Sequence, residues 1–194
     1  MIPRTVSLPD RRIWLRVAKP DWEDPLDPSY ARDNGGRWNP PRSFPVLYLN
    51  ADVVTARLQI ERMCEGTPVT PDDLLDDAYV LAAATLPPAQ SAADAVSDEG
   101  LRALALAETY PLDRRGARVS HSTCSAVGAE LEHHRIRGIW CRSACTDDGR
   151  GRELAWFSGT QNAGAVWDEP LPFGSWRYAN SWQDIKLRDQ PDPV

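Results

Sequence analysis

The sequence predicts an α/β or α+β fold in a single domain that spans residues 1–194. With 194 residues, the chain suits one compact domain, and a second domain of ordinary size would be cramped. Segments with the two-residue periodicity of strands are interspersed with segments that carry helix-start signals and an apolar stripe. Hydrophobic residues make up 42% and charged residues 26% of the chain, which argues against global disorder and against a membrane protein.

The first predicted element is a half-buried strand over residues 12–18. Apolar side chains alternate along one face, and Arg16 lies at the centre of the other. Residues 19–34 carry three prolines among five acidic residues, which predicts a long irregular loop. The loop ends in the turn Gly-Gly-Arg-Trp-Asn-Pro-Pro at 35–41, where two glycines allow close backbone approach and Arg37 supplies a fixed positive charge. Taken alone, such a turn is a weak indication of an anion site.

A short strand and a helix follow this turn directly. Residues 45–50 alternate as a strand, with Tyr48 on one of its faces. Asp52 is the expected N-cap of a helix over residues 53–65. On the helical wheel, Gln59 and Glu61 lie on opposite flanks of the apolar stripe, about 160° apart, so the two side chains cannot occupy the same site.

The rest of the chain predicts mostly scaffold elements. We expect an acidic helical turn at 71–77, a strand at 79–86, a helix at 97–110, a hairpin of strands at 138–145 and 153–158, and an irregular tail over residues 159–194 that wraps on the domain and closes with a short segment at 184–187. Between them, a helix that begins at Ser120 or Ser122 presents Ser122 and free backbone N–H groups at its N-terminal end. Such an end is a suitable place for phosphate.

The charge balance excludes several classes of function. Acidic residues outnumber basic ones, and the formal charge of −6 at pH 7 disfavours direct binding to nucleic acid or anionic lipid. No apolar stretch is long enough to span a membrane and no secretion signal is visible, so we expect a cytoplasmic protein with no membrane partner. Only Lys19 and Lys186 are lysines, so 20 of the 22 cationic side chains are arginine. Arginine suits bidentate binding of phosphate or carboxylate, although genomic base composition is the simpler explanation of the bias.

The cysteines do not predict disulfides or a metal site. Cys141 and Cys145 are four residues apart in a predicted strand, which separates them by about 13 Å, too far for one disulfide or one zinc ion. Neither they nor Cys64 and Cys124 form a Cys-x-x-Cys pair. A site that combines His121, Cys124 and a later cysteine is a remote alternative. We therefore expect no metal and interpret Cys141 and Cys145 as small buried side chains.

The turn at 35–41, the strand with Tyr48 and the helix after it resemble the signature of the RES domain family. Arg16 on the preceding strand, Ser122 in Ser-Thr-Cys-Ser at a helix start, and Ser143 in a later strand resemble further positions of the family, so the resemblance covers residues 14–157. It implies a fold similar to that of ADP-ribosyltransferase toxins, with one mixed sheet and NAD held in a cleft. It also implies that NAD is a substrate, that no cofactor is needed, and that the partner is an antitoxin with an Xre-like helix-turn-helix domain.

The resemblance assigns roles to particular residues. Cleavage of the nicotinamide–ribose bond passes through an oxocarbenium-like cation, so the site needs to hold the pyrophosphate and to place an aromatic wall and a carboxylate near the ribose. The resemblance implies that Arg16 and Arg37 bind the pyrophosphate, and that Tyr48 is the wall. Ser122 and Ser143 are candidates for contacts to phosphate or ribose hydroxyls.

The carboxylate is where this sequence departs from the family. The family carries a glutamate on the helix eleven residues after the strand tyrosine, and that count from Tyr48 reaches Gln59. A glutamine carries no negative charge and is no base, so the chemical step would be slowed unless Glu61 takes its place. Val17, where some relatives have a tyrosine after the first arginine, is a second departure.

Each candidate residue also has an ordinary structural explanation. Arg16 can be solvated or paired with an acid of the loop, Tyr48 can be a core residue with a hydrogen-bonded hydroxyl, and Ser122 can be a helix cap. Three functions remain open: a toxin that consumes NAD by hydrolysis or phosphorolysis, a protein ADP-ribosyltransferase, and a non-catalytic module with an NAD-type fold that binds an antitoxin.

Overall fold

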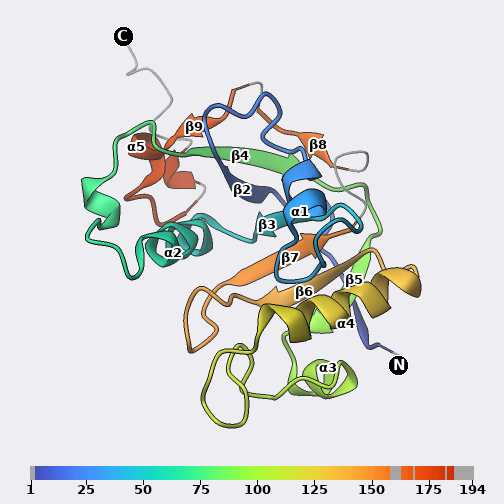
Figure 1. The fold of residues 1–194 in the computed structure, drawn as a ribbon. Helices are drawn as coiled ribbons and strands as arrows, with labels where there is room; N and C mark the ends of the chain where they lie inside the picture. The colour runs from blue at the N-terminus through green and yellow to red at the C-terminus, as the bar shows by residue number, and fades with distance from the viewer. Residues whose placement is uncertain (1–2, 158–162, 168, 182, 186–194) are drawn as a thin grey trace.

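The computed structural model describes residues 3–157, 163–167, 169–181 and 183–185 (Figure 1). Nine strands of this part of the chain form one sheet in the order β1-β5-β6-β7-β3-β2-β4-β8, and β9 also pairs with β4. Neighbouring strands are antiparallel except β5 and β6, which are parallel. The predicted fold class, helices combined with a single mixed sheet, is confirmed.

The strands are short, and most of the helices lie on one side of the sheet in Figure 1. The strands are β1 Thr5–Ser7, β2 Trp14–Ala18, β3 Leu47–Asn50, β4 Val80–Thr85, β5 Ser91–Ala95, β6 Gly138–Arg142, β7 Arg152–Trp156, β8 Gly164–Ala165 and β9 Leu171–Pro172. The helices are α1 Ser29–Asn34, α2 Val53–Cys64, α3 Asp98–Ala103, α4 His121–His133 and α5 Phe173–Trp176, with a 3₁₀ turn at Pro71–Asp73.

Several predicted elements are found where the sequence places them. The strands expected at 12–18, 45–50 and 79–86 correspond to β2, β3 and β4, and the expected hairpin is the antiparallel pair β6 and β7. The carboxylate of Asp52 accepts a hydrogen bond from the backbone N–H of Thr55, which confirms it as the N-cap of α2. The helix predicted to begin at Ser120 or Ser122 is α4, and its N-cap is Ser120.

Other predictions about the elements are wrong for identifiable reasons. The strand β2 is not half-buried but buried along its whole length, because it lies inside the sheet between β3 and β4. The segment 19–34 is not wholly irregular, because α1 begins directly after Pro28, where a proline no longer interrupts the helix. The helix expected at 97–110 ends at Ala103, since Ala105 has φ of +57°, which a right-handed helix does not accommodate.

Two further regions differ from expectation. The strand β5 was not predicted, because its sequence Ser-Ala-Ala-Asp-Ala is rich in alanine and lacks the branched and aromatic residues typical of strands. The tail expected to be irregular contains β8, β9 and α5, and the segment expected at 184–187 lies partly outside the described residues. Among the residues that the structure describes, every helix is too short or too polar to cross a membrane.

Three apolar clusters surround the sheet and leave a gap on one face. The cluster beneath α3 and α4 includes Ile139, Cys141 and Ala155 from β6 and β7. A separate cluster beneath α2 and α5 includes Leu15 from β2 and Ile60 from α2. The alternate side chains of β3 and β7 belong to a third cluster on the opposite face. The first two clusters therefore flank a part of the sheet that neither of them covers.

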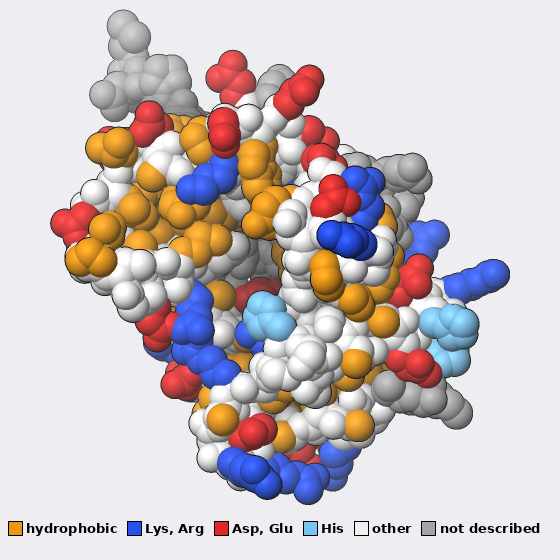
Figure 2. All heavy atoms as spheres, in the orientation of Figure 1, with side chains coloured by type: hydrophobic (Ala, Val, Ile, Leu, Met, Phe, Trp, Pro, Cys, Tyr) orange, Lys and Arg blue, Asp and Glu red, His pale blue; other side chains and the backbone are white. Residues whose placement is uncertain are grey.

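This uncovered part of the sheet forms a hollow in the molecular surface. Figure 2, drawn in the orientation of Figure 1, shows the hollow between the side of α2 and the side of α1 and α4, over strands β3 and β7. One register pair, Leu15 with Asn50, joins the fully described strands β2 and β3. The pairing of β2 with β3 is therefore much shorter than its pairing with β4, which extends from Trp14 to Ala18.

Candidate functional site

Polar side chains from β3 and β7 share the sheet face beneath the hollow. Tyr48 and Asn50 lie on the same face of β3, because their positions differ by two residues. Asn50 is directly opposite Glu153 of β7 in the antiparallel register, so these two side chains also share a face. We call Arg37, Tyr48, Asn50, Gln59 and Glu153 the central cluster.

The turn at 35–41 is fixed on the ring of Tyr48. The Tyr48 hydroxyl accepts a hydrogen bond from the backbone N–H of Trp38 at 2.8 Å and donates one to Asn39 Oδ1 at 2.8 Å. A Cβ atom on Gly36 would lie only 2.5 Å from the Tyr48 hydroxyl oxygen, so this position requires glycine. Burial raises the pKa of Tyr48, which favours the neutral phenol.

Asn39 holds the other side of the same turn. Its side chain is buried, and Nδ2 donates hydrogen bonds to the carbonyl oxygens of Ala31, at 2.6 Å, and Phe44, at 3.4 Å. The asparagine thus connects α1, the turn and Tyr48 in one network. Sequence reasoning counted Asn39 only as part of the turn motif.

The side chain of Arg37 extends from this turn to the start of α4. Its Nη1 donates to the carbonyl oxygen of Val119 at 3.2 Å and lies 3.8 Å from Cys124 Sγ. Burial lowers the pKa of Arg37, while Tyr110, Cys124 and, to a smaller extent, Glu153 raise it, and the pKa is raised overall. The same charge helps to lower the pKa of His121, after the larger effect of burial. Arg37 is therefore a fixed cation beside the N-terminal end of α4.

Ser122 lies in the first turn of α4 and is exposed. The cap itself is Ser120, whose Oγ accepts a hydrogen bond from the backbone N–H of Thr123 at 3.1 Å. The hydroxyl groups of Ser120 and Ser122 are 2.9 Å apart. The prediction that Ser122 presents a hydroxyl group at a helix N-terminus agrees with this placement.

Glu153 is a member of the central cluster that sequence reasoning missed. Its Oε1 accepts hydrogen bonds from Ser143 Oγ at 2.5 Å and from Cys145 Sγ at 3.6 Å. Burial raises the pKa of Glu153, against the opposing effects of Ser143 and Arg37. The available signal was a carboxylate next to the apolar half of a short strand, Arg-Glu-Leu-Ala-Trp, which also begins with an arginine. Ser143 is completely buried and its hydroxyl group is used by Glu153, so Ser143 does not offer the free ligand that the sequence suggested.

Gln59 and Glu61 occupy different environments, as the helical wheel predicts. Gln59 is partly buried, and its Oε1 accepts a hydrogen bond from Asn50 Nδ2 at 2.9 Å. Glu61 is exposed on another face of α2. The structure therefore brings Gln59, and not Glu61, to the central cluster.

Arg16 lies in different surroundings from Arg37. Its Nη1 donates to the carbonyl oxygen of Asp27 at 2.9 Å, and its guanidinium group lies 5.2 Å from the centre of the Trp22 ring. Burial lowers the pKa of Arg16 to about 10, although Asp27 and Asp24 act in the opposite direction. By strand alternation, Arg16 leaves β2 on the face opposite Leu15. Its role as a second ligand of the pyrophosphate stays a prediction.

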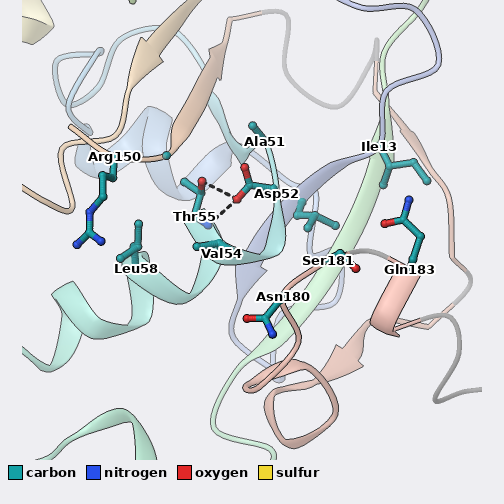
Figure 3. Close-up of a pocket in the computed structure, with 12 residues that line it drawn as sticks. Ile13, Ala51, Asp52, Val54, Thr55, Leu58, Arg150, Asn180, Ser181 and Gln183 are labelled. Carbon is teal, nitrogen blue, oxygen red and sulfur yellow. Dashed lines mark hydrogen bonds between the residues drawn. The ribbon is translucent and has the colours of Figure 1, made fainter. Parts of the chain in front are cut away.

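A separate cavity of about 620 Å³ lies beside the N-terminal end of α2 (Figure 3). Its polar side chains come from widely separated segments and include Asp52, Arg150, Asn180 and Gln183. The carboxylate of Asp52 is committed to the helix cap, where it accepts hydrogen bonds from both N–H and Oγ1 of Thr55. The central cluster is the better candidate site, because it combines a fixed cation with a carboxylate of shifted pKa.

The cysteines and histidines of the described residues are not arranged as a metal site. No group of three or more His, Cys, Asp or Glu side chains in this part of the chain has the geometry to hold a metal ion. All four cysteines are free. Cys141 is buried as expected, whereas Cys145, which was also expected to be buried, is partly exposed; Cys124 is buried and Cys64 is partly exposed.

Replacing Tyr48 by phenylalanine separates the structural role of the hydroxyl group from that of the ring. We expect Tyr48→Phe to lower the free energy of unfolding by about 2 kcal/mol, because the N–H of Trp38 and Oδ1 of Asn39 lose their partner. Urea titration measures this change. Tyr30→Phe is the matched control, since Tyr30 is 61% exposed, and we expect it to change the stability by less than about 0.5 kcal/mol. Equal stabilities for the two variants would contradict the hydrogen-bond assignment.

Comparison with known proteins gives a family match over the same region of the chain that carries the resemblance. The RES domain model matches residues 13–179, which extends beyond the resemblance found at 14–157. NAD(+) phosphorylase MbcT from Mycobacterium bovis and from two strains of Mycobacterium tuberculosis is 38% identical over 58 residues. This match covers 30% of the chain and 31% of each relative, so it spans about a third of their length.

A solved structure shares the fold over most of its length. The crystal structure of the M. tuberculosis MbcT–MbcA toxin–antitoxin complex contains a chain that matches with a TM-score of 0.70 and 22% sequence identity. The match covers 89% of this chain and 91% of that one. Because the family model spans most of the sequence and includes every strand from β2 to β9, this chain belongs to the RES domain family.

Proposed function

We propose that the chain is the toxin of a bacterial toxin–antitoxin pair and that it depletes NAD by cleaving the nicotinamide–ribose bond. The observation that carries this proposal is the position of Arg37, a partly buried cation tethered to Val119 just before the N-terminal end of α4. A helix N-terminus and an arginine side by side form a site for phosphate groups. NAD would bind as the substrate, and the chemistry requires no cofactor.

The remaining requirements of this reaction are present in the central cluster. Departure of nicotinamide leaves positive charge on the ribose, which a nearby carboxylate stabilises electrostatically. The Tyr48 ring supplies an aromatic surface, and its hydroxyl group is held by the turn that carries Arg37. The site therefore combines an anion-binding corner with an aromatic surface and an acidic floor.

The relatives favour phosphorolysis and an antitoxin as partner. The curated relatives carry the name NAD(+) phosphorylase, and the structural neighbour was crystallised as a toxin–antitoxin complex. A toxin that consumes NAD would act in the cytoplasm, and an antitoxin with a helix-turn-helix domain would neutralise it. We propose that the antitoxin, and not this acidic chain, contacts nucleic acid.

The direct test is to incubate the purified chain with NAD in the presence and absence of inorganic phosphate and to follow nicotinamide by chromatography. Phosphorolysis predicts phosphate-dependent release together with ADP-ribose that carries a phosphate on the ribose. Release without phosphate would identify hydrolysis, and label transfer to a lysate protein without free ADP-ribose would identify an ADP-ribosyltransferase. NAD binding without release would show that the chain is a non-catalytic module.

A further inference from the structure

The missing helix glutamate raises the question of which carboxylate serves the site. Gln59 is uncharged and hydrogen-bonded to Asn50, and Glu61 is exposed on another face of α2. Asp52 caps the same helix through Thr55. None of these side chains supplies a negative charge to the floor of the hollow.

Glu153 is placed where that charge is needed. It is directly opposite Asn50 in the register of β3 and β7, and Asn50 in turn donates to Gln59. Side chains of such a cross-strand pair have Cβ atoms about 5 Å apart. Asn50 thus connects the positions of Glu153 and Gln59, because it is opposite the first and hydrogen-bonded to the second. Glu153 lies on the same face of the sheet as Tyr48.

The two carboxylate oxygens of Glu153 have different environments. Oε1 is held by Ser143 and Cys145 from the segment after β6. Oε2 has no hydrogen bond to any described residue, and Glu153 as a residue is partly exposed. One oxygen is therefore held by the protein, and the other has no such contact with the described residues.

The surroundings of Glu153 act on its ionisation in two opposite directions. Burial raises its pKa, while hydrogen bonds from Ser143 and Cys145 and the charge of Arg37 stabilise the anion. The groups that interact electrostatically with Glu153 are Arg37 from the turn, Tyr48 of β3, Tyr110, and Cys141 and Cys145 on and after β6. Of these, Arg37 is the one positive charge at neutral pH.

We propose that Glu153 is the carboxylate that stabilises the ribosyl cation in this chain, in place of a glutamate at position 59. This inference rests on the proposed function. The C1′–N bond of NAD breaks, and its electron pair leaves with nicotinamide as the neutral base. The positive charge then spreads over C1′ and the ring oxygen of the ribose, opposite Oε2 of Glu153. A phosphate oxygen, or a water oxygen that gives its proton to solvent, adds to C1′, and Glu153 forms no covalent bond.

A purely structural role for Glu153 is the competing explanation. Its Oε1 anchors the segment 143–145, and the backbone N–H of Cys145 also donates to Ser143 Oγ. In Glu153→Gln, the amide oxygen still accepts from Ser143 and the buried charge is removed. Because this anchor is kept, a purely structural role predicts unchanged turnover, whereas the proposal predicts that turnover falls while the fold is retained.

The test compares kcat and KM for NAD cleavage in the wild type and three Glu→Gln variants. We expect Glu153→Gln to lower kcat about 100-fold with KM changed less than about threefold and no fall in melting temperature. Glu132→Gln, exposed on α4, is the matched control and keeps the wild-type kcat. A Glu153→Gln kcat within threefold of wild type, or the loss of activity in Glu61→Gln instead, would overturn the proposal.

A second variant keeps the test independent of the folding of Glu153→Gln. Because activity requires ionised Glu153, kcat rises with pH as the carboxyl group loses its proton. Ser143→Ala removes a hydrogen bond that stabilises the anion, so the acidic limb of the kcat profile moves to higher pH. An unmoved limb would contradict the role of Glu153. A wild-type chain that releases no nicotinamide would refute the proposed function itself, and the inference with it.

Discussion

The variant Arg37→Ala is expected to lose about 10³-fold in kcat/KM for NAD. Removing one partner of a desolvated, charge-assisted contact costs about 2–5 kcal/mol, and each 1.4 kcal/mol corresponds to a factor of about ten. Arg37 meets these conditions because it is partly buried and fixed by the carbonyl oxygen of Val119 at 3.2 Å. Steady-state measurements of NAD cleavage test the expectation.

Two further substitutions separate charge, shape and position. Arg37→Lys keeps the charge but not the planar fork, so we expect an intermediate loss. Arg114→Ala removes an exposed arginine outside the central cluster and leaves kcat/KM unchanged. If Arg37→Ala cleaves NAD as fast as Arg114→Ala, the anion-binding corner is not at Arg37 and the proposed substrate geometry is wrong.

Sequence reasoning located the parts of the site that are close together in the chain. The turn with Arg37, the strand with Tyr48 and the helix with Gln59 follow one another, so strand and helix periodicity predicts their side-chain directions. The opposite flanks of Gln59 and Glu61 follow from the same local rule. These features depend on geometry within one element, which single-sequence patterns describe well.

The parts that sequence reasoning missed depend on contacts between distant segments. Glu153 joins the cluster through the register of β7 on β3, which places it opposite Asn50, more than 100 residues away in the chain. Arg16 and Arg37 were expected to act together, yet Arg16 is held by Asp27 in the loop between them. Neither strand pairing over long separations nor the path of that loop is encoded in local periodicity.

Gly128 shows how a single distant contact positions the whole site. It lies in the interior of α4 and is buried. A Cβ atom there would lie 1.7 Å from the carbonyl oxygen of Trp38 and 2.7 Å from its carbonyl carbon. The helix thus packs directly on the backbone of the residue after Arg37, and the absence of a side chain at Gly128 permits this contact.

We therefore expect Gly128→Ala to lower the free energy of unfolding by about 3 kcal/mol and the melting temperature by about 10 °C. In a helix interior, alanine is more favourable than glycine by about 1 kcal/mol. Helix propensity alone therefore predicts that Gly128→Ala raises the free energy of unfolding. The clash prevails because the opposing atoms belong to the backbone of Trp38 and cannot rotate away. Calorimetry and urea titration measure both quantities.

The same substitution should also reduce NAD cleavage in the fraction that folds, because displacement of Trp38 moves Arg37 away from the start of α4. Gly164→Ala is the matched control, since its Cβ atom would meet Thr85 Oγ1 at an ordinary distance of 3.7 Å, and we expect less than about 0.5 kcal/mol from it. A Gly128→Ala variant more stable than wild type would mean that α4 does not rest on the turn at 35–41. In that case the helix N-terminus and Arg37 would not form one anion-binding corner, because the contact that sets their separation would be absent.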